Sequence, residues 1–258
     1  MKKIPISNAF TNNNALIAFI TGGDPDIATT REIIIEMAKN GVDLVEIGIP
    51  FSDPVAEGPV IEAADERALK SGTTVDHLFN MVASLRHEID IPLVFMTYAN
   101  PVFKYGVRKF MQKCQECGVS GVIVPDVPFE ERDELKPYCK EFNIDQIHLA
   151  APTSKGRIEM IARDTGGFLY IVSTLGVTGM RKEVSTQISE MVQAAKQAAD
   201  APCAVGFGVS TKEHVKEILK VANGAIIGSA IVNLIAKHGK NSPKIVGKFI
   251  KEIKDYCK

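Results

Sequence analysis

The sequence predicts an α/β protein, a single-domain (β/α)8 barrel (TIM barrel) that spans residues 1–258. Short apolar segments alternate with longer helical ones, which indicates parallel strands joined by right-handed crossovers. Eight such strands fit into 258 residues, close to the roughly 250 residues that this fold uses. Glycine-rich turns follow the seventh and eighth strands, where many barrels bind phosphate.

Each expected strand is a short run rich in Val, Ile, Phe or Tyr, bounded by Gly, Pro, Asn or Asp. In chain order the strands are Leu16–Thr21, Val42–Ile49, Leu93–Tyr98, Gly121–Val124, Gln146–Ala150, Phe168–Ser173, Cys203–Phe207 and Ala225–Gly228. An open doubly wound sheet is the alternative arrangement. The turn Thr21–Pro25 after the first strand argues against it, because that turn lacks the G-x-G-x-x-G spacing of a dinucleotide-binding sheet.

Helices are expected between these strands, and several of them end on Gly or Asn, as a C-terminal cap favours. They include Ile27–Asn40, Val107–Cys117, Glu130–Phe142, Ser185–Ala199 and Thr211–Val221. Before the first strand, Pro5 and a run of asparagines make a poor helix.

Composition and charge argue against several classes of function. The formal net charge is −1, so no basic surface for nucleic acid or an anionic membrane is indicated. No apolar run reaches the roughly 18 residues of a membrane span, and the N-terminal residues lack the apolar core of a secretion signal. The five cysteines are too few for a disulfide scaffold, which favours a reducing cytoplasm.

Glu46 is the first candidate catalytic residue, because it interrupts an otherwise apolar strand. Strand alternation places Glu46 with Leu44 and Gly48 on one face, and Val45 and Ile47 on the face that suits helix packing. Glu46 is therefore expected at the barrel mouth, with room for a ligand above Gly48. A partly desolvated carboxylate has a raised pKa, which suits proton transfer near neutral pH. The alternative is a buried Glu paired with Lys or Arg.

Glu57 is the second candidate, in the proline-rich loop Phe51–Pro59 that follows the same strand. Two carboxyl groups in different environments, Glu46 and Glu57, are the arrangement that acid–base chemistry uses. Asp53 in the same loop is expected only to form a turn before Pro54.

Phosphate binding is predicted at two turns, Gly206–Ser210 and Gly228–Ala230. Glycine lets backbone N–H groups approach an anion, and the second turn opens a helix whose N-terminal dipole favours negative charge. Two ordinary tight turns are the alternative.

Further candidates lie near the same end of the barrel. The loop Leu175–Met180 holds two glycines and is predicted to be a lid that closes on ligand. Tyr170 and Tyr98 are expected to point inward, with core packing as the alternative. Cys114 and Cys117 share a helical face with apolar residues, which indicates core packing rather than zinc binding, and His148 is expected to be structural.

Seven motifs taken together resemble the tryptophan synthase alpha subunit family. In chain order they are TGGDP, VEIGIPFSDPVAEGP, YANPVF, PDVP, GVTG, GFGVS and GSAIV, and the resemblance runs from about Leu16 to the C-terminus. It implies a lyase that splits indole-3-glycerol phosphate into indole and glyceraldehyde 3-phosphate, without a metal or cofactor of its own. It also implies a partner in an alpha2beta2 complex, the pyridoxal-phosphate-dependent beta subunit, to which indole passes through a tunnel.

The resemblance also implies roles for individual residues. Glu46 matches the catalytic Glu and Tyr170 an active-site Tyr, whereas Glu57 stands where the family usually has a catalytic Asp. Glu is longer than Asp by one methylene, which displaces the carboxylate by up to about 1.5 Å. The residues implied in substrate binding are Phe19, Tyr98 and Leu149 around the indole ring, Thr178 and Gly179 in the lid, and Phe207, Gly208, Gly228 and Ser229 around the phosphate.

Two other functions stay open on the sequence alone. One is another phosphate-sugar isomerase or lyase on the same barrel, which needs no indole pocket. The other is an alpha-like subunit of low activity that mainly activates a beta partner, which the Glu57 departure makes conceivable.

Overall fold

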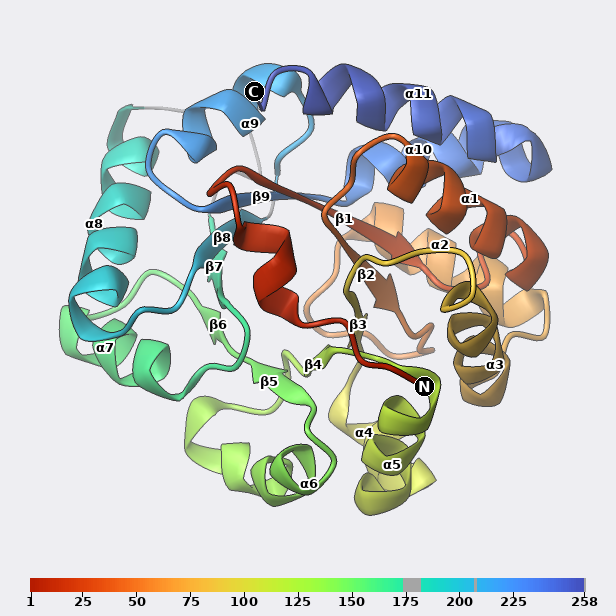
Figure 1. The fold of residues 1–258 in the computed structure, drawn as a ribbon, viewed down its shortest axis with the longest axis horizontal. Coiled ribbons are helices and arrows are strands. Elements are labelled where there is room, and N and C mark those ends of the chain that lie inside the picture. The colour runs from red at the N-terminus through yellow and green to blue at the C-terminus, as the bar shows by residue number, and fades with distance from the viewer. Residues whose placement is uncertain (174–181, 207, 258) are drawn as a thin grey trace.

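The computed structural model describes residues 1–173, 182–206 and 208–257. Its parallel strands form one sheet in the order β5-β4-β3-β2-β1-β9-β8-β7-β6, gathered at the centre of the molecule with helices around them (Figure 1). The strands are β1 (Ala15–Thr21), β2 (Leu44–Gly48), β3 (Leu93–Met96), β4 (Gly121–Ile123), β5 (Asp145–Ile147), β6 (Leu149–Ala150), β7 (Leu169–Val172), β8 (Cys203–Gly206) and β9 (Gly224–Ile227).

One predicted strand is split, and its two pieces complete the ring. β5 pairs with β4 and β6 pairs with β7, and only His148 separates the two pieces in the sequence. The His148 N–H donates to the Thr165 hydroxyl at 3.0 Å, not to a neighbouring strand. The nine pieces therefore correspond to the eight predicted strands, and the predicted (β/α)8 barrel is confirmed.

The helices surround this ring, and none of those described is long and apolar enough to cross a membrane. They are α1 (Ile27–Lys39), α2 (Pro59–Lys70), α3 (Val75–Leu85), α4 (Ala99–Tyr105), α5 (Val107–Cys117), α6 (Lys136–Glu141), α7 (Lys155–Asp164), α8 (Lys182–Ala198), α9 (Lys212–Leu219), α10 (Ser229–His238) and α11 (Ser242–Lys254), with short 3-10 helices η1 (Ile6–Phe10), η2 (Phe129–Glu134) and η3 (Gly239–Asn241).

The expectation of one helix over Glu130–Phe142 was wrong. The segment forms η2 and then α6, with Pro137 in the first turn of α6. Proline has no N–H to donate to the preceding turn, so a continuous helix cannot pass through it.

The core has an inner and an outer layer. Inside the ring, alternate strand residues such as Ile17, Leu44 and Tyr170 pack together. Outside it, the intervening residues such as Val45 and Ile47 pack with the helices. The side chains of β2 therefore alternate between the inner and the outer layer, as the sequence predicts.

The N-terminal segment closes one end of the ring. η1 lies across the strands in Figure 1, and its Ile6 and Phe10 join the inner layer. The Phe10 ring lies 5.6 Å from the ring of Phe168, between centroids. The opposite end, to which the C-terminal ends of the strands point, is the end where barrel active sites form.

A buried ion pair holds α2 against the loop that follows β1. Asp24 is 1% exposed, and Arg67 donates to its two oxygens over 2.8 and 2.7 Å. Two parallel hydrogen bonds fix the guanidinium plane as well as its distance. The pair sets where α2 sits relative to the barrel mouth.

Breaking this pair should destabilise the fold. In Arg67→Met the buried Asp24 carboxylate loses its partner, and we expect the free energy of unfolding to fall by roughly 2 to 3 kcal/mol, below the usual range for fully buried pairs because Arg67 is partly exposed. Urea unfolding measures the change. Lys70→Met is the matched control, because Lys70 forms only an exposed pair with Glu66. An equal, small effect of both substitutions would contradict the role of the pair.

Candidate active site

Glu46 lies on β2 inside the ring, with none of its surface exposed. Neither of its carboxyl oxygens has a hydrogen-bond partner among the described residues. Burial raises the pKa of Glu46 to about 8. In the described part of the chain the alternative of a Lys or Arg partner is not realised, so Glu46 carries its proton at neutral pH and can give it up.

Tyr170, on β7, lies near Glu46 inside the ring. Burial, together with the charge of Glu46, raises the pKa of Tyr170 far above its usual range, so its hydroxyl stays protonated. A side chain at Gly206, on the neighbouring β8, would overlap that hydroxyl. Leu149 of β6 is in register with Tyr170 and packs against the same inner layer.

Phe19 shapes the floor of the mouth. It is in register with Glu46. Its ring lies so close to Gly48 that a Cβ added to this glycine would be 2.8 Å from the ring. The room expected above Gly48 is thus filled by Phe19. Gly228 also leaves space for the Phe19 side chain, because a Cβ added to this glycine would lie 3.3 Å from Phe19.

Glu57 lies half-buried in the loop between β2 and α2, beside two other titratable groups. A side-chain hydrogen bond joins it to Asp65 and another to Tyr98, and burial raises its pKa. Tyr98 is 2% exposed, and its hydroxyl accepts the Ala56 N–H at 3.2 Å. Tyr98 therefore supports the loop that carries Glu57.

Asp65 is the residue that the sequence analysis missed. It lies on the buried face of α2 with Ile61, Ala64 and Ala68. The available signal was a carboxylate that shares the helical spacing of an apolar stripe, because charged side chains are almost never fully buried unless they are paired. Asp65 lies on a helix face, away from the strand ends and loops that carry the active sites of barrels.

The predicted phosphate turns lie at the ends of β8 and β9. Gly208 has a φ of 72°, a conformation that favours glycine. Gly228 is the N-cap of α10 and Ser229 its first residue, and no side chain caps this helix, so its first N–H groups are available to an anion. The predicted contributions of Thr178, Gly179 and Phe207 lie outside the described residues.

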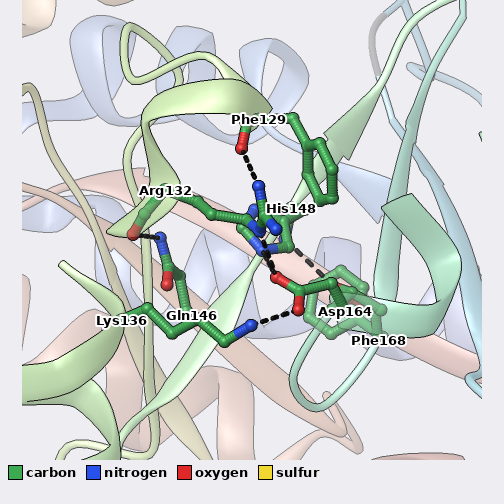
Figure 2. Close-up of polar contacts among 8 residues, drawn as sticks. Phe129, Arg132, Lys136, Gln146, His148, Asp164 and Phe168 are labelled. Atoms are coloured by element: carbon green, nitrogen blue, oxygen red, sulfur yellow. Dashed lines mark hydrogen bonds and ion pairs between the residues drawn. The ribbon is translucent and has the colours of Figure 1, made fainter. Parts of the chain in front are cut away.

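His148 belongs to a separate network on the outside of the ring. Figure 2 shows Arg132, Lys136 and His148 converging on Asp164 at the end of α7. Burial lowers the pKa of His148, and its ring packs on Phe129 at 5.3 Å between centroids. The network joins the split strand to α6 and α7, which agrees with a structural role.

The cysteines and the other possible metal ligands add no second site in the part of the chain that the structure describes. All five cysteines are free and buried, and Cys114 and Cys117 pack in the outer core. Within residues 1–173, 182–206 and 208–257, no group of three or more His, Cys, Asp or Glu side chains could hold a metal ion.

Comparison with known proteins gives consistent matches. A family model described as tryptophan synthase alpha chain matches residues 7–257. The tryptophan synthase alpha chain of Lacticaseibacillus casei is 44% identical over 249 residues, which cover 96% of this chain and 94% of the relative. That of Methanocaldococcus jannaschii is 46% identical over 226 residues, 87% and 80% of the two chains. A structure of the tryptophan synthase a2b2 complex from Pyrococcus furiosus matches with a TM-score of 0.87 and 37% identity, over 94% of this chain and 98% of that one.

The burial of Glu46 should make stability depend on pH. The folded protein keeps a proton up to a pH of about 8, because the pKa of Glu46 is raised, whereas the unfolded chain releases it near its ordinary pKa. Stability contributed by the protonated group is thus lost as pH rises between these values. The free energy of unfolding of Glu46→Gln, relative to that of the parent, should therefore rise by roughly 3 kcal/mol between pH 4.5 and pH 7.

Urea unfolding at several pH values measures this gain. Glu134→Gln, at an exposed position, is the control for the loss of one carboxylate. A relative stability of Glu46→Gln that stays constant with pH would show that Glu46 is not held neutral by the fold.

Proposed function

The chain belongs to the tryptophan synthase alpha chain family, and from this premise we propose that Glu46, Glu57 and Tyr170 are its catalytic residues. The protein is a carbon–carbon lyase of tryptophan biosynthesis, which cleaves indole-3-glycerol phosphate to indole and glyceraldehyde 3-phosphate. The observation that carries the proposal is the buried Glu46 carboxyl group, protonated at neutral pH and unpaired among the described residues.

The cleavage needs two proton movements that one such group can supply. The Glu46 carboxyl group first gives its proton to indole C3, which produces the protonated indolenine with its N–H retained. The resulting carboxylate then takes the proton of the hydroxyl on the carbon attached to C3. As this hydroxyl becomes a carbonyl, the carbon–carbon bond breaks, its electron pair returns to the indole ring, and Glu46 recovers its proton.

Glu57 and Tyr170 support that step from two sides. Protonation of C3 puts positive charge on the indole nitrogen, and the Glu57 carboxylate stabilises this charge by accepting the N–H. Tyr170, near Glu46, keeps its hydroxyl proton and can donate a hydrogen bond to the Glu46 carboxylate that forms during the reaction. Phe19, Tyr98 and Leu149 form the apolar surroundings of the ring.

The phosphate supplies orientation at a distance from the reacting carbon. We assign it to backbone N–H groups at Gly179, Gly208, Gly228 and Ser229, with Thr178 and Phe207 beside it. The uncapped N-terminus of α10 supports this assignment. Because the turns at Gly206–Ser210 and Gly228–Ala230 hold no Lys or Arg, backbone groups have to carry most of the binding.

The partner is the tryptophan synthase beta subunit, in an alpha2beta2 heterotetramer. Two exposed apolar side chains suit an interface at the mouth, Val55 at 77% and Phe103 at 46% exposure. Val55 lies in the loop that carries Glu57, so the beta subunit can influence the site directly. We further assign the whole chain, 1–258, to one barrel domain and place it in the cytoplasm, where its five free cysteines suit a reducing environment.

Replacement of Glu46 should stop turnover without abolishing binding. Gln keeps the shape of Glu but can neither give nor take the proton, so kcat should fall by about 10²- to 10⁴-fold while KM changes little. Steady-state assay of indole release measures both constants, with Glu134→Gln as the control. Near-normal kcat in Glu46→Gln would remove Glu46 from the mechanism.

Loss of the Glu57 charge should slow the reaction in the isolated subunit. Glu57→Gln and Glu57→Ala both remove the carboxylate that faces the indole nitrogen, and kcat should fall by about 10²- to 10³-fold in each. Asp53→Ala is the matched control, because Asp53 is an exposed carboxylate of the same loop whose side chain contacts Ser52. If Glu57→Ala and Asp53→Ala are equally active, another group stabilises the indole nitrogen.

A further inference from the structure

Asp65 and Glu57 form a pair of carboxyl groups that no cation neutralises in the described part of the chain. Asp65 is 4% exposed, and a side-chain hydrogen bond joins it to Glu57. The ion pairs among described residues include neither carboxyl group, the nearest Arg on α2 being committed to Asp24. A hydrogen bond between two carboxyl groups requires that one of them keep its proton.

We propose that Asp65 is a positioning residue that, as the neutral acid, donates a hydrogen bond to the Glu57 carboxylate and aims it at the indole N–H. The proposal deepens the assigned function, since it rests on the role of Glu57 as the carboxylate that faces the indole nitrogen. Asp65 itself touches neither the substrate nor the reacting atoms.

The surroundings decide which of the two carboxyl groups holds the proton. Asp65 is less exposed than Glu57, which lies half-buried at the mouth, and burial favours the neutral form. Burial and the charge of Glu57 raise the pKa of Asp65 to about 8, while the Phe51 N–H and the Thr21 hydroxyl act weakly in the other direction. Glu62, exposed on the same helix, adds a further negative charge that disfavours a doubly ionised pair.

The contacts leave Glu57 able to accept a further hydrogen bond from the substrate. A carboxylate can accept about four hydrogen bonds, and Asp65 and Tyr98 supply two of them. The Tyr98 hydroxyl also holds the loop by accepting the Ala56 N–H. A buried acceptor without a donor is costly, and an indole N–H at this place removes that cost.

The arrangement makes binding of the indole ring sensitive to alkaline pH. Below a pH of about 8 Asp65 keeps its proton and the pair carries one charge, because its pKa is raised. Above that pH Asp65 ionises, the donor is lost and the two carboxylates repel each other. A ligand that requires the aimed Glu57 therefore binds less tightly as pH rises through 8.

The test uses the Glu46→Gln enzyme, so that Glu46 neither titrates nor turns the ligand over. Calorimetry measures the affinity of indole-3-propanol phosphate, which lacks the hydroxyl needed for cleavage, from pH 7 to pH 9.5. Its phosphate is essentially fully ionised throughout this range, since the second pKa is about 6. Affinity should fall by up to about 30-fold between these limits, the factor expected when binding requires a proton held with a pKa near 8.

Three variants in that background separate positioning from mere folding. Asp65→Asn can still accept from Phe51 and donate to Glu57 but cannot ionise, so it should bind with normal affinity at pH 7 and lose the pH dependence. Asp65→Ala removes the donor, so it should bind at least 10-fold more weakly at pH 7 and also lose the pH dependence. Glu66→Gln removes the neighbouring, exposed carboxylate and should follow the Glu46→Gln curve.

Glycerol 3-phosphate, which lacks the indole ring, distinguishes a failure of the assigned function from a failure of the role of Asp65. Its affinity should be the same in all four proteins and should not change with pH. If indole-3-propanol phosphate binds no better than glycerol 3-phosphate in Glu46→Gln, the assigned function fails and the role of Asp65 with it. If it binds better but the Asp65→Asn curve keeps the parent slope, or the parent shows no slope, the function stands and the role of Asp65 is overturned.

Discussion

Glu46 lies inside the barrel where, among the described residues, neither a cation nor a hydrogen-bond donor reaches it. An ionised carboxylate in such a place is expensive, so the group stays protonated at neutral pH. The proton it retains is the one that the proposed mechanism uses. The apolar residues of the inner layer therefore have a chemical role, because a single lysine near β2 would pair with Glu46 and fix it as an anion.

The other parts of the site follow from keeping this carboxyl group dry and the substrate in place beside it. Phe19 covers the strand position next to Glu46, and glycines at positions 48, 206 and 228 allow Phe19 and Tyr170 to lie close to the strands. α2 has two functions, since Arg67 attaches it to the loop after β1 and Asp65 reaches the loop after β2. One helix thus sets the positions of two neighbouring loops at the mouth.

Local rules explain why much of this could be predicted from the sequence. Alternation along β2 was enough to place Glu46 inside the ring, because a two-residue period leaves only two faces. The single helix expected over Glu130–Phe142 failed at Pro137, a position where backbone chemistry overrides an apolar pattern. The strand around His148 is divided by a hydrogen bond to Thr165, and Asp65 became visible only through the partners that folding brings to it. Contacts between distant segments leave no trace in local periodicity.

The closure of the barrel by η1 has a consequence for the order of events during synthesis. Ile6 and Phe10 leave the ribosome roughly 160 residues before Phe168, the ring against which Phe10 packs, and at 5 to 20 residues per second this is a delay of about 8 to 30 s. During that interval η1 can pack only on residues of the first strands, such as Ile17 and Leu44, and Phe10 lacks the ring of Phe168. The segment made early therefore completes its packing only after β7 has been made.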